Sequence, residues 1–340
     1  MKSKAEPTAF AGYKISRDRE RRALTISLPQ KCVEMARDHL PILLEGGEPS
    51  TPKGKKLMDM ADALIMAPRE PGKPLTKEQV SVQQKIGSLK YIEKVQPKLS
   101  LAIHRLSCIM ASPPPEAGII ADALIRTAYE DRYTGITYSA PTEGESSHVE
   151  GRLCAHVPDE MRVRGHKAIG ITLDSSAGSA LEASADATWG DRNVYGLLLT
   201  KAGGSVAHMT KKIGIVATSS MENEGIASGR AAELVEHARD IEHALGKPPE
   251  RPTVVLTDNS ANLSVACKTA AASRSKHFLR RYLALQRRVA EGAVTMVKID
   301  DENMPADFLT KWVSQKKLRK SVDYATNARA KVQDPDDKSR

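Results

Sequence analysis

Residues 253–262 read Thr253-Val-Val-Leu-Thr-Asp-Asn-Ser-Ala-Asn262. The short apolar run Val254–Leu256 is typical of a strand that is buried on both faces. Asp258 comes directly after this strand, and Asn259 and Ser260 are residue types that cap the N-terminus of a helix. In an open α/β sheet, ligands bind at the carboxyl ends of the strands. Asp258 therefore has two readings, as a metal ligand or as a helix cap, and this stretch alone does not decide between them.

The composition is that of a folded, basic protein. The chain has 340 residues, a length that corresponds to about two domains. Hydrophobic residues make up 40% of it and supply a core, whereas aromatic residues contribute only 4%. The net charge of +9 favours a polyanionic partner, either nucleic acid or an anionic membrane surface, over a basic surface without such a partner.

The cysteines and the apolar runs exclude several classes of protein. The four cysteines lie far apart and form no Cys-x-x-Cys pair, which argues against a zinc site and fits a reducing compartment. No apolar run approaches the roughly 18 residues of a membrane span. The first residues also lack the apolar segment of a secretory signal. We therefore expect an intracellular protein, cytoplasmic or nuclear, without a membrane partner.

Residues 1–139 are predicted to form a strand hairpin followed by helices. Two strand-like segments on either side of a charged turn predict the hairpin over residues 8–28. Pro29 can open a helix that continues to about Leu40. Apolar residues at helical spacing then predict three further helices within residues 86–128.

The rest of the chain is predicted to comprise a linker, an α/β domain and a tail. Residues 140–180 are rich in Pro, Gly and Ser and are interpreted as a linker or connection. Residues 181–314 show three strands, a long helix, the strand at 253–257, two helices, a further strand and a last helix near Pro305. Residues 315–340 are charged and poor in aromatic residues, so we expect a basic, disordered tail.

Four carboxylates occupy comparable places in this α/β pattern. Asp186 ends the first strand and Asp258 ends the strand at 253–257. Glu224 and Asp307 fall in the first turns of the long helix and of the last helix. Carboxylates that converge repel each other unless cations lie among them. Mg²⁺ prefers such oxygen ligands, and two Mg²⁺ ions, or Mn²⁺ in their place, would activate a water and stabilise the leaving oxygen of a phosphodiester.

Two acidic residues compete for the position on the long helix. Ser219-Ser-Met-Glu222 has the pattern of a capping box, in which Glu222 folds back onto the backbone at Ser219. Glu224 precedes Ala227 by three residues and therefore shares the inward face of the helix. We assign Glu222 to the structure and Glu224 to the metal ions.

Five short segments occur in a fixed order along the second half of the chain. They are Ala185-Asp-Ala-Thr-Trp189, Ser219-Ser-Met-Glu-Asn-Glu-Gly225, Asp258-Asn-Ser-Ala-Asn262, Ser273-Arg-Ser-Lys-His277 and Ala306-Asp-Phe-Leu-Thr-Lys311. Together they resemble the motifs of copia-type retrotransposon polyproteins, which end in a reverse transcriptase followed by a ribonuclease H. The resemblance implies a ribonuclease H-like mixed five-stranded sheet flanked by helices for residues 181–314. For residues 1–139 it implies a smaller α+β remnant of the reverse-transcriptase thumb and connection.

The resemblance also implies a function. It is that of an Mg²⁺-dependent endonuclease that hydrolyses the RNA strand of RNA–DNA hybrids, with Asp186, Glu224, Asp258 and Asp307 as catalytic metal ligands. The Tyr-x-Asp-Asp turn of the polymerase is absent, so polymerase activity is not expected. The polymerase and integrase parts of such a polyprotein are expected partners. The alternative is a catalytically inactive, nucleic-acid-binding remnant of a retrotransposon.

Five polar residues near the third and fourth motifs are candidates for contact with the hybrid. They are Asn259, Ser260, Arg274, Lys276 and His277. Basic side chains supply salt-dependent affinity for phosphates, and a hybrid duplex is recognised by its shape and its 2′-OH groups. His277 has a second reading as a catalytic group, and Asn259 and Ser260 have a second reading as helix caps.

Several positions depart from the motifs or from good helix sequence, among them Phe278 and Leu279, which replace a more polar pair. Thr188 stands where the first motif has a second Asp, beside the expected ligand Asp186. Gly225 stands where the second motif has Tyr. Gly225 and Gly229 are each expected to weaken the long helix by about 1 kcal/mol. All four carboxylates are nevertheless present.

Overall fold

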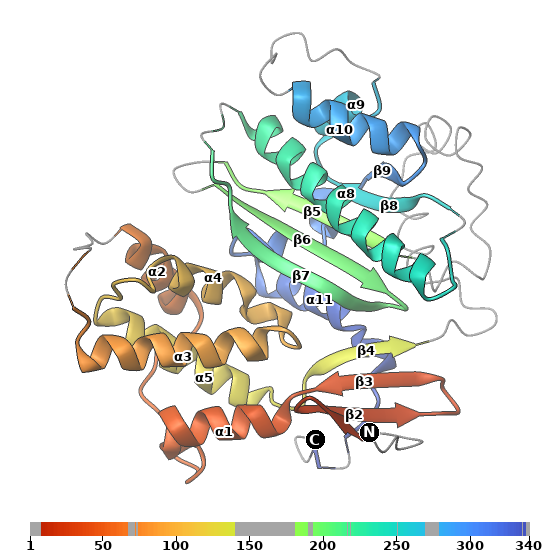
Figure 1. Cartoon of the computed structure of the whole chain (residues 1–340). Helices are drawn as coiled ribbons and strands as arrows, with labels where there is room; N and C mark the ends of the chain where they lie inside the picture. The colour runs from red at the N-terminus through yellow and green to blue at the C-terminus, as the bar shows by residue number, and fades with distance from the viewer. Residues whose placement is uncertain are drawn as a thin grey trace. The chain divides into compact units, whose positions relative to one another are not determined.

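The computed structural model describes residues 8–337 except for 67–71, 73, 140–180, 190–192, 216, 218, 250, 269–278 and 335. The predicted linker 140–180 therefore lies outside the described residues. Two compact units are present, one of Met1–Thr137 with Ala330–Arg340 and one of Tyr138–Arg329. We call them unit 1 and unit 2 and describe each by itself (Figure 1).

Unit 1 combines a four-stranded sheet with a set of helices. The sheet has the order β1-β2-β3-β4, from Ala9–Phe10, Tyr13–Asp18, Ala23–Ser27 and Gly135–Ser139, the last strand running past the unit's end. The helices are α1 (Pro29–His39), α2 (Gly54–Met66), α3 (Lys77–Glu93), α4 (Ser100–Cys108) and α5 (Glu116–Glu130). The predicted hairpin and the helix that opens at Pro29 are both present. The sequence prediction missed α2, which buries Ala61, Leu64 and Ile65.

Unit 2 is built on a mixed five-stranded sheet in the order β7-β6-β5-β8-β9. The strands are β5 (Glu182–Ala187), β6 (Val194–Lys201), β7 (Gly204–Lys212), β8 (Thr253–Thr257) and β9 (Val294–Lys298). The pairs β5–β6 and β6–β7 are antiparallel, whereas β5–β8 and β8–β9 are parallel. This is the ribonuclease H-like sheet, and the fold class expected from the sequence is confirmed.

Helices cover both faces of this sheet. In Figure 1, α8 (Ser220–Ala244) crosses one face, with α9 (Ser260–Ala266) and α10 (Leu279–Ala290) beyond it, and α11 (Gln315–Thr326) lies behind the other face. Successive residues of β6 point to opposite faces. Leu197 and Leu199 therefore join the core under α8, while Leu198 packs with Phe308 and Tyr324 on the other side. The sheet is buried on both faces, as the apolar run of its central strand predicts.

The end of the chain differs from the prediction in two ways. The expected helix near Pro305 is a short 3-10 turn, η6 (Asp307–Leu309). The expected disordered tail over 315–340 is wrong for its first part, because residues 315–326 form α11. Its apolar stripe, which the surrounding charges obscure in the sequence, packs on the core of unit 2. Among the described residues, no helix has the length and apolarity that a membrane crossing needs.

A buried polar network joins the three helices on the α8 face. The amide of Asn262 donates to the hydroxyls of Ser228 in α8 (2.8 Å) and of Thr257 (3.2 Å). The hydroxyl of Tyr282 in α10 lies 2.9 Å from the Asn262 amide oxygen and 3.2 Å from the Met221 carbonyl, and donates to these acceptors. Buried polar groups cost stability unless they are paired, so this network fixes how the three helices pack.

Gly225 lies against the ring of Tyr282. A Cβ atom at position 225 would come within 2.6 Å of the Tyr282 ring, closer than real contacts allow, whereas a Cβ at Gly229 meets nothing within 4 Å. The departure from the motif at position 225 thus has a structural reason, because an aromatic ring from α10 fills the space of a side chain. The expected weakening of the helix by both glycines stays a prediction, and only at Gly229 does the structure leave room for a side chain that would remove it.

Substitution of these two glycines by alanine should have opposite effects. We expect Gly225→Ala to destabilise the chain by about 1–3 kcal/mol through overpacking against Tyr282. Gly229→Ala is the matched control and should stabilise it by up to about 1 kcal/mol, because alanine favours a helix. Urea unfolding of both variants measures the two effects, and destabilisation by both would contradict the packing described here.

Candidate metal centre

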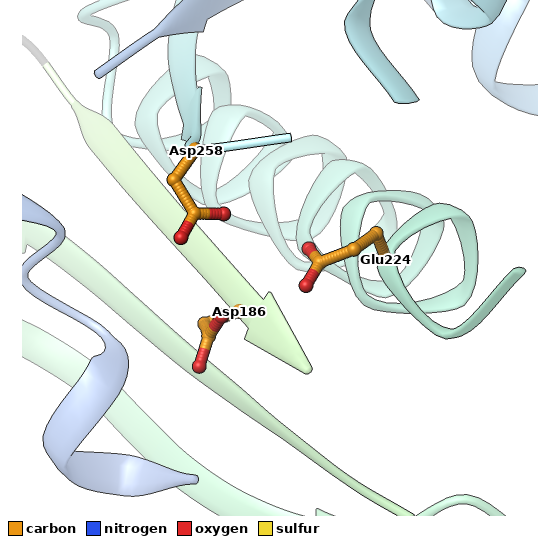
Figure 2. Close-up of side chains that lie close together, drawn as sticks. All are labelled: Asp186, Glu224 and Asp258. Carbon is orange, nitrogen blue, oxygen red and sulfur yellow. The ribbon is translucent and has the colours of Figure 1, made fainter. Parts of the chain in front are cut away.

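The acidic residues meet at one end of the sheet of unit 2. Asp186 lies in β5 and is paired with Gly196 of β6. Asp258 directly follows β8, which runs parallel to β5, so the carboxyl ends of the two strands meet at the same edge. Glu224 reaches this edge from α8. Figure 2 shows the three carboxylates facing one another across a small space.

Two groups of carboxylate oxygens are close enough to share cations. Asp186, Glu224 and Asp258 each offer one oxygen, and these oxygens lie within 4.8 Å of one another. Asp258, Asp301 and Asp307 form a second such group. All four predicted acids therefore come together, with Asp258 common to both groups. Asp301, which is exposed, is a fifth acid that the sequence analysis did not single out.

Glu224 is buried, and only one of its two carboxylate oxygens accepts a hydrogen bond from the described residues. It is 5% exposed, and its Oε1 accepts a hydrogen bond from the backbone N–H of Ala187 at 3.3 Å. Its Oε2 is buried without a hydrogen-bond partner among the described residues. Ser219 caps α8 by accepting from the backbone N–H of Glu222 at 3.2 Å. The carboxylate of Glu224, and not that of Glu222, is grouped with Asp186 and Asp258.

Asp307 is held at the centre by a close approach of η6 to the sheet. A Cβ at Gly196 would lie 2.6 Å from Leu309 Cβ and 2.8 Å from Thr310 Cγ2, so only a glycine lets η6 come this near. The Thr310 hydroxyl donates a hydrogen bond to Asp186 and lies 3.0 Å from the carbonyl of Asp307. Thr310 thereby connects the strand that carries one acid to the turn that carries another.

Two lysines form ion pairs with the same oxygen of the Asp307 carboxylate. Asp307 is fully buried, and its Oδ2 pairs with Lys311 Nζ at 3.0 Å and with Lys317 Nζ. Its Oδ1 is buried without a partner among the described residues. Lys317 belongs to α11, in the stretch expected to be disordered, so its part in the centre was not foreseeable from the sequence. One oxygen of Asp307 is thus fixed and the other is open to a ligand.

Burial and mutual repulsion shift the titration of these acids. Burial, followed by the neighbouring charge of Asp307, raises the pKa of Asp186 to about 7. Burial, followed by the charges of Asp186 and Asp258, raises the pKa of Glu224 to about 9. The pKa of Asp258 is raised for the same reasons, burial and then Asp307. Without a cation, the folded chain therefore favours protonated carboxyls at this site.

The donor set fits divalent cations that prefer oxygen. It consists of carboxylates, two of which, Glu224 and Asp307, present a buried oxygen without a partner. Mg²⁺ and Mn²⁺ are suited to carboxylate oxygens, whereas zinc and copper sites favour nitrogen and sulfur. A cation would satisfy the open oxygens and offset the repulsion that raises the pKa values. The residues present therefore fit the Mg²⁺ or Mn²⁺ ions that the sequence resemblance implies.

The predicted nucleic-acid-binding residues are only partly described. The side chain of Asn259 caps α9 by accepting from the backbone N–H of Asn262 at 2.9 Å, so the capping role is present. Ser260 begins α9 and is exposed. Arg274, Lys276 and His277 lie outside the described residues.

The sequence of the chain is similar to plant retrotransposon polyproteins. It is 25% identical over 223 residues to the retrovirus-related Pol polyprotein from transposon RE1 of Arabidopsis thaliana, covering 60% of this chain and 15% of the polyprotein. It is 26% identical over 235 residues to the corresponding protein from transposon RE2, covering 68% of this chain and 14% of that protein. The chain thus spans about one seventh of these relatives. The resemblance to copia-type polyproteins inferred from the five motifs is confirmed.

Comparisons with family profiles and with solved structures do not extend this similarity. The chain matches no protein-family profile. A solved structure of LC11-RNase H1 in complex with an RNA/DNA hybrid is similar, with a TM-score of 0.30 and 15% identity over 36% of this chain and 88% of that one. The fold of unit 2 is established here by the order and directions of its own strands.

Substitution of Gly196 tests the placement of η6. We expect Gly196→Ala to displace η6, and Asp307 with it, because the new Cβ would overlap Leu309 and Thr310. The variant should lose about 1–3 kcal/mol of stability and bind Mn²⁺ more weakly in a calorimetric titration. Gly214→Ala is the control, since a Cβ there meets nothing within 4 Å. Unchanged Mn²⁺ affinity in the Gly196 variant would contradict the close approach.

The pH dependence of stability tests the burial of Glu224. Its pKa is raised in the folded chain from 4.5 to about 9, so between these values the folded chain binds more protons than the unfolded chain. Stability of the metal-free chain should then fall as the pH rises through this window. We expect Glu224→Gln to be more stable than the natural chain near pH 8 in EDTA, by about 1 kcal/mol or more, and to lose this advantage near pH 5. An equal difference at both pH values in urea unfolding would exclude this explanation.

Proposed function

We propose that unit 2 is an Mg²⁺-dependent endonuclease that hydrolyses the RNA strand of RNA–DNA hybrids. The observation that carries the proposal is the meeting of Asp186, Glu224, Asp258 and Asp307 at one end of a ribonuclease H-like sheet. The sequence similarity to retrovirus-related Pol polyproteins from transposons supports the same proposal. The basic net charge suits a polyanionic substrate.

The four acids have distinct surroundings, from which we infer distinct tasks. Asp258 belongs to both groups of acids, whereas Asp186 lies close to Glu224 and Asp258 and accepts a hydrogen bond from Thr310, directly after the η6 turn. Glu224 and Asp307 each present one fixed and one open oxygen. Bound Mg²⁺ ions would supply an activated water and stabilise the leaving 3′ oxygen. The acids would hold these ions, with Asp186, Glu224 and Asp258 around one and with Asp258, Asp301 and Asp307 around the other.

The lysines beside Asp307 have a positioning task in this proposal. Lys311 and Lys317 fix Oδ2 of Asp307 and leave Oδ1 for the metal. Burial alone would lower the pKa of Lys311, but the charges of Asp186 and Asp307 raise it above its usual value, so this lysine stays charged. Neither lysine is assigned a proton transfer.

The alternative is a module that binds nucleic acid without cutting it. It predicts hybrid binding with steep salt dependence and no turnover with either Mg²⁺ or Mn²⁺. The retention of all four acids, two of them with open buried oxygens, favours the enzyme. Polymerase activity is not proposed, since the chain lacks the Tyr-x-Asp-Asp turn.

Cleavage of a labelled RNA–DNA hybrid tests the proposal. We expect Mg²⁺-dependent cleavage that leaves 5′-phosphate ends, and we expect Asp258→Asn to reduce it by at least about 100-fold, since even groups that only orient metal ligands contribute about 10–100-fold. Glu222→Gln is the matched control, because Glu222 is buried near the centre but is not grouped with the acids. Metal-dependent cleavage that survives in Asp258→Asn would refute the site, and no cleavage by the natural chain would favour the binding module.

A further inference from the structure

One surface beside the acids is used neither by the fold nor by the metal centre. It consists of Trp189, Lys211 and Lys212, and we call it the β5–β7 end surface. We propose that it binds the RNA–DNA hybrid next to the cleavage centre, with the lysines on backbone phosphates and the indole stacked on a base. This inference rests on the proposed function and extends it to the path of the substrate.

The strand register places the two lysines beside the centre. Ala187 of β5 pairs with Tyr195 of β6, and Tyr195 pairs with Lys211 of β7, so the three residues form one row across the sheet. Lys212 lies in the next row, opposite Val194, so the side chains of the two lysines leave the end of β7 on opposite faces of the sheet. Neighbouring strands are about 4.8 Å apart, so the backbone of Lys211 lies about 10 Å from that of Ala187. The N–H of Ala187 holds Glu224, which ties this row directly to the acids.

This separation is within the reach of one bound duplex. Along its helix axis a duplex advances about 3.4 Å per nucleotide of each strand, so about 10 Å along that axis spans three nucleotides. A phosphate held at Lys211 would therefore lie a few nucleotides from a scissile phosphate at the acids. Cations at that distance attract the substrate without occupying the metal positions.

The side chains of the two lysines are also available to bind a phosphate. Both residues are exposed, and neither ammonium group has a hydrogen-bond or ion-pair partner among the described residues. Lys311 and Lys317, the cations at the centre itself, are by contrast engaged with Asp307. A plain structural explanation exists, because lysines at the edge of a sheet prevent edge-to-edge association. That explanation predicts self-association, and not weaker hybrid binding, when the lysines are removed.

Trp189 follows a residue whose backbone is fixed, and Trp189 itself is exposed to solvent. Its side chain is 62% exposed, although tryptophan is usually among the more buried residues. The preceding residue, Thr188, is fixed on both sides: its N–H donates to the Val194 carbonyl at 2.9 Å, and its carbonyl accepts from the Asn223 amide at 2.7 Å. Trp189 is three residues from Asp186, so the two backbones are at most about 11 Å apart.

A nucleobase explains this exposure better than a protein partner does. An aromatic ring accepts any base by stacking, and isolated rings beside cationic groups are the usual means of sequence-independent binding. A protein interface would need a larger apolar patch. The other exposed large apolar residues of unit 2 in the described part of the chain are Val206, Ile215, Ile241, Leu245 and Leu283. Ile215 follows β7 at the end that carries Lys211 and Lys212. Val206 lies toward the opposite end of β7, and the other three lie on or just beyond helices. Trp189 and Ile215 are only two apolar side chains, which fall short of such a patch.

Hybrid binding without cleavage tests the surface. Fluorescence anisotropy of a labelled hybrid is measured in EDTA over a series of NaCl concentrations. We expect Lys211→Gln/Lys212→Gln to lower the slope of log K against log salt by about two, one for each lost phosphate contact. Trp189→Ala should weaken binding about tenfold without changing the slope. The matched controls are Lys247→Gln and Leu245→Ala, at the far end of α8 about 30 Å from Glu224, and they should bind like the natural chain.

A second measurement does not depend on these variants. The chain has two tryptophans, so Trp312→Phe leaves Trp189 as the source of indole emission, and the hybrid should quench it. An unchanged salt slope, self-association of the lysine variant with normal hybrid affinity, or emission that does not respond to the hybrid would each overturn the inference. Cleavage is scored separately with Mg²⁺. If the hybrid binds through this surface but is not cleaved, the proposed function alone is refuted. If the hybrid is cleaved and the variants bind it as the natural chain does, this inference alone is refuted.

Discussion

The repulsion among buried carboxylates is the constraint on which unit 2 depends. Asp186, Glu224 and Asp307 are each at most 5% exposed, and they lie with Asp258 at one end of the sheet. Burial and like charge both oppose the ionisation of Asp186 and Glu224, which is why the pKa values of these two acids are raised. Such an arrangement costs stability and adds nothing to the core. The arrangement is explained by a binding site for divalent cations, because the positive charge of bound cations would offset the repulsion between the carboxylates.

Two glycines and two lysines make this arrangement possible. Gly196 lets η6 approach β6, and this approach delivers Asp307 to the strand that carries Asp186. Gly225 makes room for the ring of Tyr282, which joins α10 to α8 one residue beyond Glu224. Lys311 and Lys317 offset part of the charge on Asp307 without covering its second oxygen. The acids are therefore placed by backbone contacts that side chains larger than hydrogen would block.

The sequence predicted the sheet and four acids because both leave local signals. An apolar run followed by Asp258 marks the end of a buried strand, and the helical spacing from Glu224 to Ala227 marks an inward face. Features that depend on register or on distant packing left no such signal. Lys211 is beside the centre only because β7 pairs with β6 in one register, and Lys317 reaches Asp307 only because α11 folds onto the sheet. The apolar stripe of α11 was hidden by the surrounding charges, and its stretch was misread as disordered.

The most direct test of this account is anomalous diffraction from crystals of the chain grown with Mn²⁺. The account predicts anomalous peaks that contact the carboxylates of Asp186, Glu224 and Asp258, with Asp307 near a second ion. Peaks elsewhere on the surface and none at this end of the sheet would contradict it. So would a map in which Asp307 lies far from Asp186.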